Sequence, residues 1–391
     1  MTTLDERKGA RDGTGWAGAA GPDPGPSRQV DGRELRVVVA DSLGADTAAW
    51  NRLVERCALP SPFLRSWWLA AMTPPAEAQF ALVRSGDDLV GGLALERRRL
   101  PGLPVLVHLG AGPLSPDHLD LLAAPGEETR VIETLGRWLH RRGSRLVHVA
   151  GAVEGNRLHA ALGPRAVVTV EEAAPYVELS GDADAYLTTL PPIMRNSVRR
   201  STRKLGRLGE LSFTVVEPAG LEDSLTRLRS LHAGQFGDDS GLIREWDRFC
   251  AAARAGHGAG EFQLFELRVG DEVAAVDVVF TVSGRMSYYQ GGRSLEERHS
   301  GAGTVLMANG FRWACETGMS EVDFLRGTEP YKMQWAADTR RLLRLRVGIG
   351  PRGRAAMTAI RVREAPRTRA AARRVRAAFQ TVSVFGTEVG G

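Results

Sequence analysis

The chain has 391 residues, with 51 lysines and arginines against 46 acids and a net charge of +5. A chain of this length usually forms about two domains and can bury a large core without disulfide bonds. Its three cysteines are too few and too scattered for a disulfide framework or a zinc site. No apolar run is long enough to cross a membrane, and the N-terminus lacks the pattern of a signal peptide. The composition thus excludes a disulfide-rich secreted scaffold and favours a cytoplasmic location.

Positive charge is concentrated in two segments. Residues 340–376 hold thirteen arginines and one acid, and residues 195–207 hold six basic residues and no acid. The rest of the chain is acidic, so the overall charge does not argue for a nucleic-acid partner. Only three of the basic residues are lysines, namely Lys8, Lys204 and Lys332. This bias slightly favours a chemical use for a lysine, whose ammonium is compact and titratable.

The first half of the chain predicts an alternation of strands and helices after a leader. Residues 1–32 are rich in Gly, Pro, Asp and Arg, which is typical of a disordered segment. The elements predicted from apolar spacing are, in chain order, a strand at 35–40, helices at 46–57 and 64–72, strands at 79–84, 89–96 and 104–109, a helix at 128–142, a strand at 145–150 and a helix at 157–162.

The second half repeats this order. Its predicted elements are a strand at 211–216, helices at 221–235 and 242–255, strands at 261–269, 273–282 and 285–290, a helix at 302–317, a strand at 321–325, a helix at 330–337 and a strand at 341–349. Residues 351–391 are typical of a basic, alanine-rich helical tail. The repeat predicts two similar α/β units with a boundary near residues 180–190.

The sharpest local motif is RHSGAGT at residues 298–304, between a predicted strand and a predicted helix. Glycines let a phosphate approach the backbone, and the first turn of a helix offers free N–H groups and a favourable dipole. An arginine at the start of the loop adds a charge-assisted hydrogen bond. A glycine-rich turn that needs no ligand is the competing interpretation. The motif is neither a Walker loop nor a dinucleotide-binding fingerprint.

A second cluster of candidates follows the predicted strand at 321–325. Asp323 interrupts an apolar strand and needs a partner such as an arginine or a backbone donor. Arg326 lies at the strand's end, where α/β folds often contact ligands. Tyr331 has the chemistry of a general acid for a leaving thiolate, and Lys332 that of an oxyanion stabiliser. Alternatively, Tyr331 and Trp335 are core aromatics and Lys332 is a solvated charge.

These residues carry a resemblance to a known family. The stretch 261–347 resembles the acyltransferase domain of the CelD/BcsL-type GNAT family, which is similar to the FemABX transferases. The matching features are Tyr288-Tyr289, the glycine loop and its helix, Val322-Asp323-Phe324, Arg326-Gly327, and Tyr331-Lys332 with Trp335. The first half adds Trp50, Pro62-Phe63, Trp67-Trp68 and Met194-Arg195-Asn196. Together the resemblance covers roughly residues 33–350.

The resemblance implies an α/β (α+β) fold of tandem GNAT-like (acyl-CoA N-acyltransferase) domains, each a mixed, mostly antiparallel sheet flanked by helices. A degenerate N-terminal domain would span 33–180 and the acyltransferase domain 181–350. The implied reaction moves an acyl group, with acetyl the expected one, from acyl-CoA to an amine or hydroxyl. No metal is required.

The resemblance also assigns roles to residues. The residues implied to hold CoA are Arg298, Ser300, Gly301, Ala302, Gly303, Thr304, Tyr289 and Gln290. Tyr331 or Lys332 would lie at the chemistry. The strand at 273–282 lacks the clear Glu or His base expected there and offers only Asp277, so the acceptor amine loses its proton to water or to Asp277. The residues predicted to contact the acceptor are Asp323, Arg326, Arg195, Arg199 and Trp335.

The basic segments leave several partners open. Residues 195–207 fit a solvated helix, a clamp for an anionic substrate, or a tRNA contact. The tail fits a membrane or RNA contact, or a polar extension. We expect the acceptor to be a small molecule or a glycan precursor of the cell envelope. The alternatives are a Fem-like transferase that uses aminoacyl-tRNA, and a catalytically idle scaffold.

Overall fold

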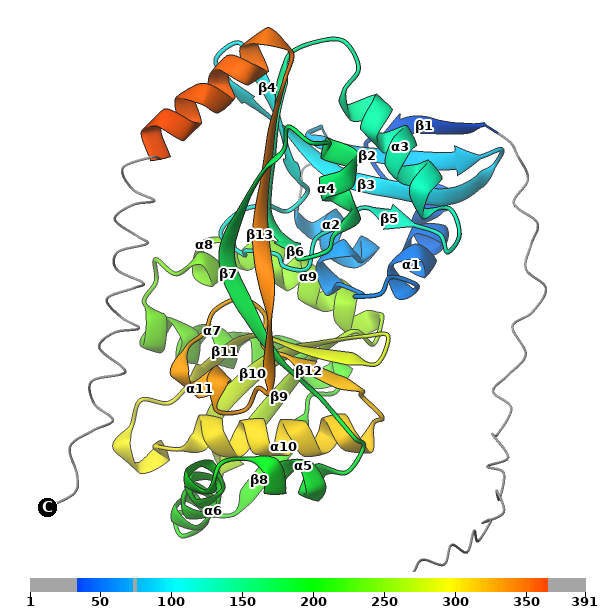
Figure 1. Ribbon diagram of the computed structural model, residues 1–391. Helices are drawn as coiled ribbons and strands as arrows, with labels where there is room; N and C mark the ends of the chain where they lie inside the picture. The colour runs from blue at the N-terminus through cyan, green and yellow to red at the C-terminus, as the bar shows by residue number, and fades with distance from the viewer. Residues whose placement is uncertain (1–33, 73–75, 365–391) are drawn as a thin grey trace, which may run out of the picture. The chain divides into compact units, whose positions relative to one another are not determined.

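The computed structural model of the protein describes residues 34–72 and 76–364. The predicted leader and the part of the basic tail beyond residue 364 lie outside these residues. Within them, one 13-stranded mixed sheet carries helices on its faces (Figure 1). The strands are β1 (Leu35–Ala40), β2 (Ala78–Ser85), β3 (Asp88–Leu100), β4 (Leu103–His108), β5 (Leu122–Ala123), β6 (Arg145–Val153), β7 (Val167–Glu178), β8 (Leu211–Val215), β9 (Phe262–Val269), β10 (Glu272–Val282), β11 (Arg285–Arg293), β12 (Glu321–Asp323) and β13 (Asp338–Ile349).

Most helices lie where the apolar spacing predicts them, but that spacing does not predict the helix at 183–189, and the helix at 192–206 corresponds to the basic segment 195–207. The helices are α1 (Thr47–Glu55), α2 (Ser66–Met72), α3 (Glu128–Leu139), α4 (Arg157–Leu162), α5 (Ala183–Thr189), α6 (Pro192–Gly206), α7 (Leu221–Phe236), α8 (Gly241–Arg244), α9 (Trp246–Gly258), α10 (Ala302–Glu316) and α11 (Pro330–Met333). A further helix spans 350–364.

Both halves of the sheet have the same topology. Strands β1 to β4 pair antiparallel in sequence, and β6 then pairs parallel with β4. Strands β8 to β11 pair in the same way, and β12 pairs parallel with β11. The mixed, mostly antiparallel α/β fold that the sequence predicts is therefore confirmed.

The halves exchange their last strands. β7 follows β6 in the chain but pairs with β12, whereas β13 follows β12 but pairs with β6. β7 and β13 also pair with each other at the middle of the sheet. The sheet is therefore continuous from β1 to β8. The domain boundary near 180–190 stays a prediction.

The sequence analysis missed β7 entirely. Its sequence, VVTVEEAAPYVE, contains acids and a proline, and much of its surface is exposed. Such a pattern gives no apolar alternation to detect. The strand forms because β12 and β13 supply backbone partners on its two sides.

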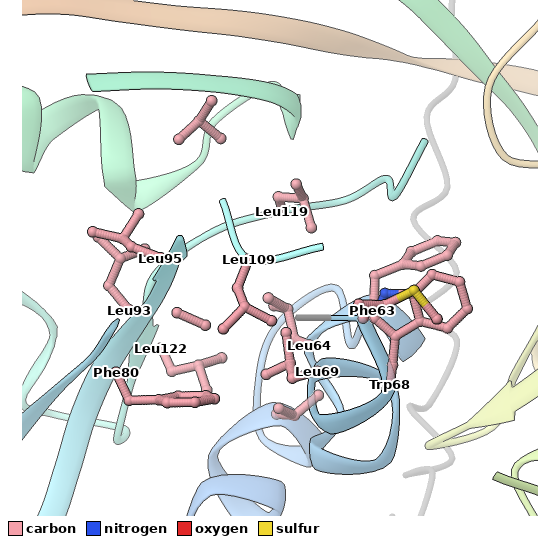
Figure 2. Packing of buried hydrophobic residues seen from close by; sticks show 14 of the residues in the cluster. Phe63, Leu64, Trp68, Leu69, Phe80, Leu93, Leu95, Leu109, Leu119 and Leu122 are labelled. Carbon is pink, nitrogen blue, oxygen red and sulfur yellow. The ribbon is translucent and has the colours of Figure 1, made fainter. Parts of the chain in front are cut away.

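Apolar side chains form large clusters around the sheet. Figure 2 shows part of the first cluster, in which Phe63, Leu64, Trp68 and Leu69 pack near Leu109 and Phe80. The second cluster centres on α10 and includes Val279, Phe311 and Trp335. Strand β10 contributes to both clusters and is therefore buried on both faces. In the described part of the chain, no helix is long and apolar enough to cross a membrane.

Candidate active site

Strand β11 has an open edge near the middle of the second half. β12 pairs with it only over Arg285–Ser287, although β11 continues to Arg293. After Asp323 the chain turns away, and the Phe324 N–H donates to the carbonyl of Pro175 on β7. β11 also bulges at Tyr289, because Val278 pairs with Gln290 and Val279 with Tyr288. Its edge beyond Ser287 can therefore hydrogen-bond to an extended ligand.

Asp277 lies on β10, the strand that pairs with the opposite edge of β11. By strand alternation it shares a face with Ala275 and Val279, toward α10. Its Oδ2 is buried and has no hydrogen-bond partner among the described residues. Burial raises the pKa of Asp277 to about 7, and the charge of Arg293 opposes the shift. A Cβ at Gly291 would lie 2.5 Å from Asp277 Oδ1, so only glycine lets β11 pass the carboxylate at this distance.

Tyr331 joins Asp277 at the site. It projects from α11, and 49% of its surface is exposed. Burial of the hydroxyl raises its pKa, the charges of Glu329 and Asp277 raise it further, and Arg293 lowers it. The phenol therefore stays protonated at neutral pH and can donate a proton. The structure thus brings together two of the three residues predicted to be catalytic.

Lys332 has a different environment. It is 9% exposed, and its Nζ donates to the carbonyl of Arg326 at 2.5 Å and lies 3.0 Å from Glu329. These contacts tie the short helix α11 to the loop after β12. Lys332 therefore holds in place the helix that carries Tyr331, and its contacts give no indication of an oxyanion role.

The glycine loop forms the N-terminus of α10. Gly301 is the residue before the helix, with a φ of +97°, and no side chain caps the first turn. The N–H groups of the first turn, including those of Ala302, Gly303 and Thr304, have no intrahelical acceptor and can bind an anion. A Cβ at Gly301 would lie 2.4 Å from Ser201 Oγ on α6. Ser300, just outside the helix, is exposed.

The arginine at the start of the loop is already paired. Arg298 contacts Glu296 at 2.6 Å and Glu272 at 2.8 Å on the surface. Together with His299, these two acids form a possible metal-binding group among the described residues. Because the guanidinium of Arg298 binds both carboxylates, we assign no metal to them.

Arg293 is a residue that the sequence analysis missed. It ends β11, it acts on the pKa values of Asp277 and Tyr331, and its Cδ lies 3.8 Å from the Cβ position of Gly303. It therefore connects the open edge of β11 to the glycine loop. No ion pair of Arg293 occurs among the described residues. Nothing in the sequence distinguishes it from the other arginines.

The basic helix α6 packs beside the glycine loop. Met194 and Leu205 bury one face against the α10 cluster, and Lys204 Nζ donates to the Glu297 carbonyl at 2.7 Å. Arg195 is half-buried and Arg199 is exposed on this helix. The basic segment 195–207 and the glycine loop 298–304 thus lie next to each other, although they are about a hundred residues apart in sequence.

Asp323 has the partners that its burial demands. Its Oδ2 contacts Arg285 at 3.0 Å and Arg340 at 2.9 Å, and its Oδ1 accepts from the Leu325 N–H at 2.7 Å. Arg285 and Arg340 also bind Glu321. This network lies at the point where β11 and β12 separate, so it holds the edge open.

The loop after β4 completes the network from the first half. Arg326 binds Asp117 through both its backbone and its side chain, with Nε–Oδ1 at 2.8 Å. Tyr289 donates its hydroxyl to the Leu114 carbonyl at 2.8 Å. The loop at 108–118, the counterpart of the glycine loop in the first half, therefore contacts the second half.

Three residues predicted to bind ligands lie as follows. Trp335 is 3% exposed and stacks on Phe311 at 5.2 Å, so its side chain belongs to the core. Gln290 is half-buried on the free part of β11, next to the bulge at Tyr289. The Tyr289 ring packs against Phe280 at 4.9 Å, which leaves its backbone to the open edge.

Comparison with known families agrees with this geometry. Residues 193–333 match the family model described as "Acetyltransferase (GNAT) domain". This segment is therefore similar to GNAT acetyltransferase domains. It includes Asp277, the glycine loop and Tyr331. No curated protein matches the chain.

Solved structures resemble the chain in fold. FemX has a TM-score of 0.57 at 9% identity, covering 77% of this chain and 95% of FemX. The C-terminal domain of a putative lysylphosphatidylglycerol synthetase from Agrobacterium fabrum has a TM-score of 0.53 at 11% identity, covering 83% and 97%. L-PGS from Bacillus licheniformis has a TM-score of 0.50 at 13% identity, covering 71% and 85%. The chain thus shares the tandem-GNAT fold of these structures.

Proposed function

We propose that the protein is an N-acyltransferase that moves an acyl group, acetyl first among the candidates, from acyl-CoA to an amine. One observation carries the proposal. Asp277, with a pKa raised to about 7 and a buried oxygen without a partner among the described residues, lies on β10 next to β11, whose other edge is partly open, within the segment that matches the GNAT family model. A carboxyl group with this pKa can act as a general base near neutral pH.

Acyl-CoA would supply an acyl group activated as a thioester. Asp277 accepts the proton that the acceptor amine loses as its nitrogen bonds to the acyl carbon. Tyr331 donates a proton to the sulfur as the carbon–sulfur bond breaks. The free N–H groups of β11 are placed to hold an extended chain along its edge and to polarise the acyl oxygen.

The anionic end of CoA fits the N-terminus of α10. Its first-turn N–H groups have no side-chain cap, and Gly301 leaves the backbone accessible. Arg293 offers a guanidinium without an ion pair among the described residues, whereas Arg298 must first leave two carboxylates. Arg195 and Arg199 on α6 add positive charge beside this turn. These residues support a diphosphate site.

Titration calorimetry with acetyl-CoA and longer acyl-CoAs tests the proposal on the full chain. We expect micromolar binding that Arg293→Ala weakens about tenfold, the effect of one lost charge-assisted contact. Arg298→Ala should have a smaller effect. Arg312→Ala, at the opposite end of α10, is the matched control. If the folded protein binds no acyl-CoA, the proposal fails.

A second candidate is a Fem-like transfer from aminoacyl-tRNA, favoured by the exposed basic face of α6 and by the fold shared with FemX. Binding to RNA would fall steeply with salt, because each phosphate contact releases counterions. A filter-binding assay with tRNA at two salt concentrations distinguishes this donor from acyl-CoA. The acceptor that we favour is a small molecule or an envelope glycan precursor, and residues 351–391 could contact a membrane surface.

A further inference from the structure

We propose that the protein has a second ligand site, for an amphiphilic anion, between the helix at 350–364 and the sheet of the first half. A pocket of about 520 Å³ lies there, lined by β3, β4, β6, β13 and this helix. Small-molecule sites commonly have volumes of about 300–1,000 Å³. In Figure 1 this helix lies near β4, whereas α11 lies near β10 and β11.

The pocket is separate from the candidate active site. Arg346 of the pocket lies near the far end of β13 from α11, which directly precedes this strand. Eight residue steps separate Asp338 from Arg346. At roughly 3.3 Å per residue, this corresponds to about 26 Å along β13. None of the residues that line the pocket belongs to β10, β11 or α11, so the two sites share no lining residue.

The pocket has an apolar floor and a cationic rim. Val105, Val107 and Leu146 of the floor are 7%, 6% and 2% exposed. Four arginines and one glutamate are among the lining residues, so positive charge prevails. Arg99 and Arg363 are exposed on the rim, and no ion pair of either occurs among the described residues. This combination fits one anionic head group on an apolar body.

A buried polar group points to a ligand as well. Arg346 is 8% exposed and lines the pocket. Its Nη1 donates to Glu364 at 2.7 Å, but its Nε has no hydrogen-bond partner among the described residues. Nε itself is closed to solvent, so Arg346 favours an anion in the pocket through the positive charge of its guanidinium. Beside it, burial and the charges of Arg346 and Arg344 lower the pKa of His148 to about 4, so the ring is neutral.

The wall formed by the helix is held firmly in place. A Cβ at Gly348 would lie 2.2 Å from the Gly353 carbonyl oxygen, and one at Gly353 would lie 2.2 Å from that of Arg145. These glycines let the start of the helix lie directly against β6 and β13. Met357 then packs with Val105 and Leu146. The pocket therefore has fixed walls on both sides.

The chemistry of the lining favours one class of ligand. No phenylalanine, tyrosine or tryptophan side chain lines the pocket, so it lacks the large aromatic platform on which nucleobases usually stack. A small hydrated anion would make no use of the apolar floor. A neutral apolar molecule would make no use of the arginines. A carboxylate or phosphate monoester on an acyl-sized body satisfies both parts.

Titration calorimetry of the full chain tests the site with three probes below their micelle concentrations: decanoate, decyl phosphate and the neutral octyl glucoside. We expect decanoate or decyl phosphate to bind at one site and octyl glucoside to bind at least tenfold more weakly. The two anions distinguish a carboxylate site from a phosphate site. The proposal is overturned if octyl glucoside binds as tightly as the anions. It is also overturned if neither decanoate nor decyl phosphate binds.

Variants locate the bound probe. Arg363→Glu should weaken anion binding at least tenfold, because it replaces a rim cation with an anion. Arg361→Glu changes the same charge on the same helix outside the pocket and should leave binding unchanged. Both side chains are exposed, so both variants should fold. Equal losses in the two variants, or displacement of the probe by saturating CoA, would place the probe elsewhere and contradict the proposal.

Discussion

At the scale of single residues, Asp277 combines two properties that normally oppose each other. One oxygen of its carboxyl group is shielded from water, and yet the neighbouring strand β11 has a partly open edge that a substrate can reach. Desolvation without a compensating donor raises its pKa to about 7. A protein gains no stability from such a group, so its place at the strand edge suits a chemical role.

Asp277→Asn should separate activity from stability. Because the carboxylate form is the base, kcat/KM should rise with pH through about 7 in the wild type. The variant should lose this rise and roughly 10²–10⁴-fold in rate. The pKa of the Asp277 carboxyl is near 4 in the unfolded chain and near 7 in the folded protein. The free energy of unfolding of the wild type therefore decreases as the pH rises from about 4 to about 7. Above pH 7 the variant should therefore have the higher urea midpoint. An unchanged pH profile would exclude Asp277 as the base.

Tyr331→Phe tests the proton donor. The Tyr331 hydroxyl makes no hydrogen bond to the described residues, and half of the side chain is exposed. We therefore expect kcat to fall about 10²-fold while the free energy of unfolding changes by less than about 0.5 kcal/mol. Tyr176→Phe, which removes a hydroxyl near Asp338, is the control. Equal rates for the two variants would show that the leaving thiolate takes its proton from solvent.

At the scale of elements, α6 and α10 meet at a glycine. Gly301 has a left-handed backbone, and α6 approaches it closely through Ser201. This approach brings the basic face of α6 beside the free N–H groups of α10. Neither helix alone explains the placement, because the requirement comes from their contact.

Gly301→Ala should destabilise the protein by about 1–2 kcal/mol, since a Cβ there is strained by the backbone angle and meets Ser201. Gly303→Ala is the matched comparison, because the nearest atom to its Cβ is 3.8 Å away. Alanine also favours the helix, so this variant should be as stable as the wild type or more so. Denaturant midpoints measure both effects. Equal losses at the two positions would show that the contact with α6 is not what demands glycine.

At the scale of the whole molecule, the exchange of β7 and β13 links the two halves. All thirteen strands belong to one hydrogen-bonded sheet, which has β1 at one end and β8 at the other. The buried ion network at Asp323 adds a second link, because Arg285 also donates to the Pro60 carbonyl in the first half at 2.6 Å. We therefore expect the two structural repeats to unfold together.

We predict one cooperative unfolding transition for the described part of the chain. Tryptophan fluorescence reports on both halves, through Trp50 and Trp68 in the first and Trp313 and Trp335 in the second, and far-UV circular dichroism reports on all of the sheet. In urea the two signals should change together. Two separated transitions would instead support independent domains divided near residues 180–190.

Asp323→Asn should cost about 3–5 kcal/mol of unfolding free energy, because it leaves two buried arginines short of a carboxylate. Asp338→Asn, an exposed change on β13, should cost less than about 1 kcal/mol. Both are read from urea midpoints. A small loss at Asp323 would show that Glu321 alone neutralises the arginines.

The sequence by itself determined most of the element order, the mixed α/β class and the candidates at the glycine loop, Asp277 and Tyr331. Local periodicity and glycine spacing carry that information, because they depend on neighbours within a few residues. It could not reveal β7, the strand exchange, the role of Arg293 or the core position of Trp335. Those features depend on contacts between segments distant in sequence, such as Pro175 with Phe324 or Asp117 with Arg326. Only the tertiary structure, where backbone partners and buried charges must be satisfied, decided them.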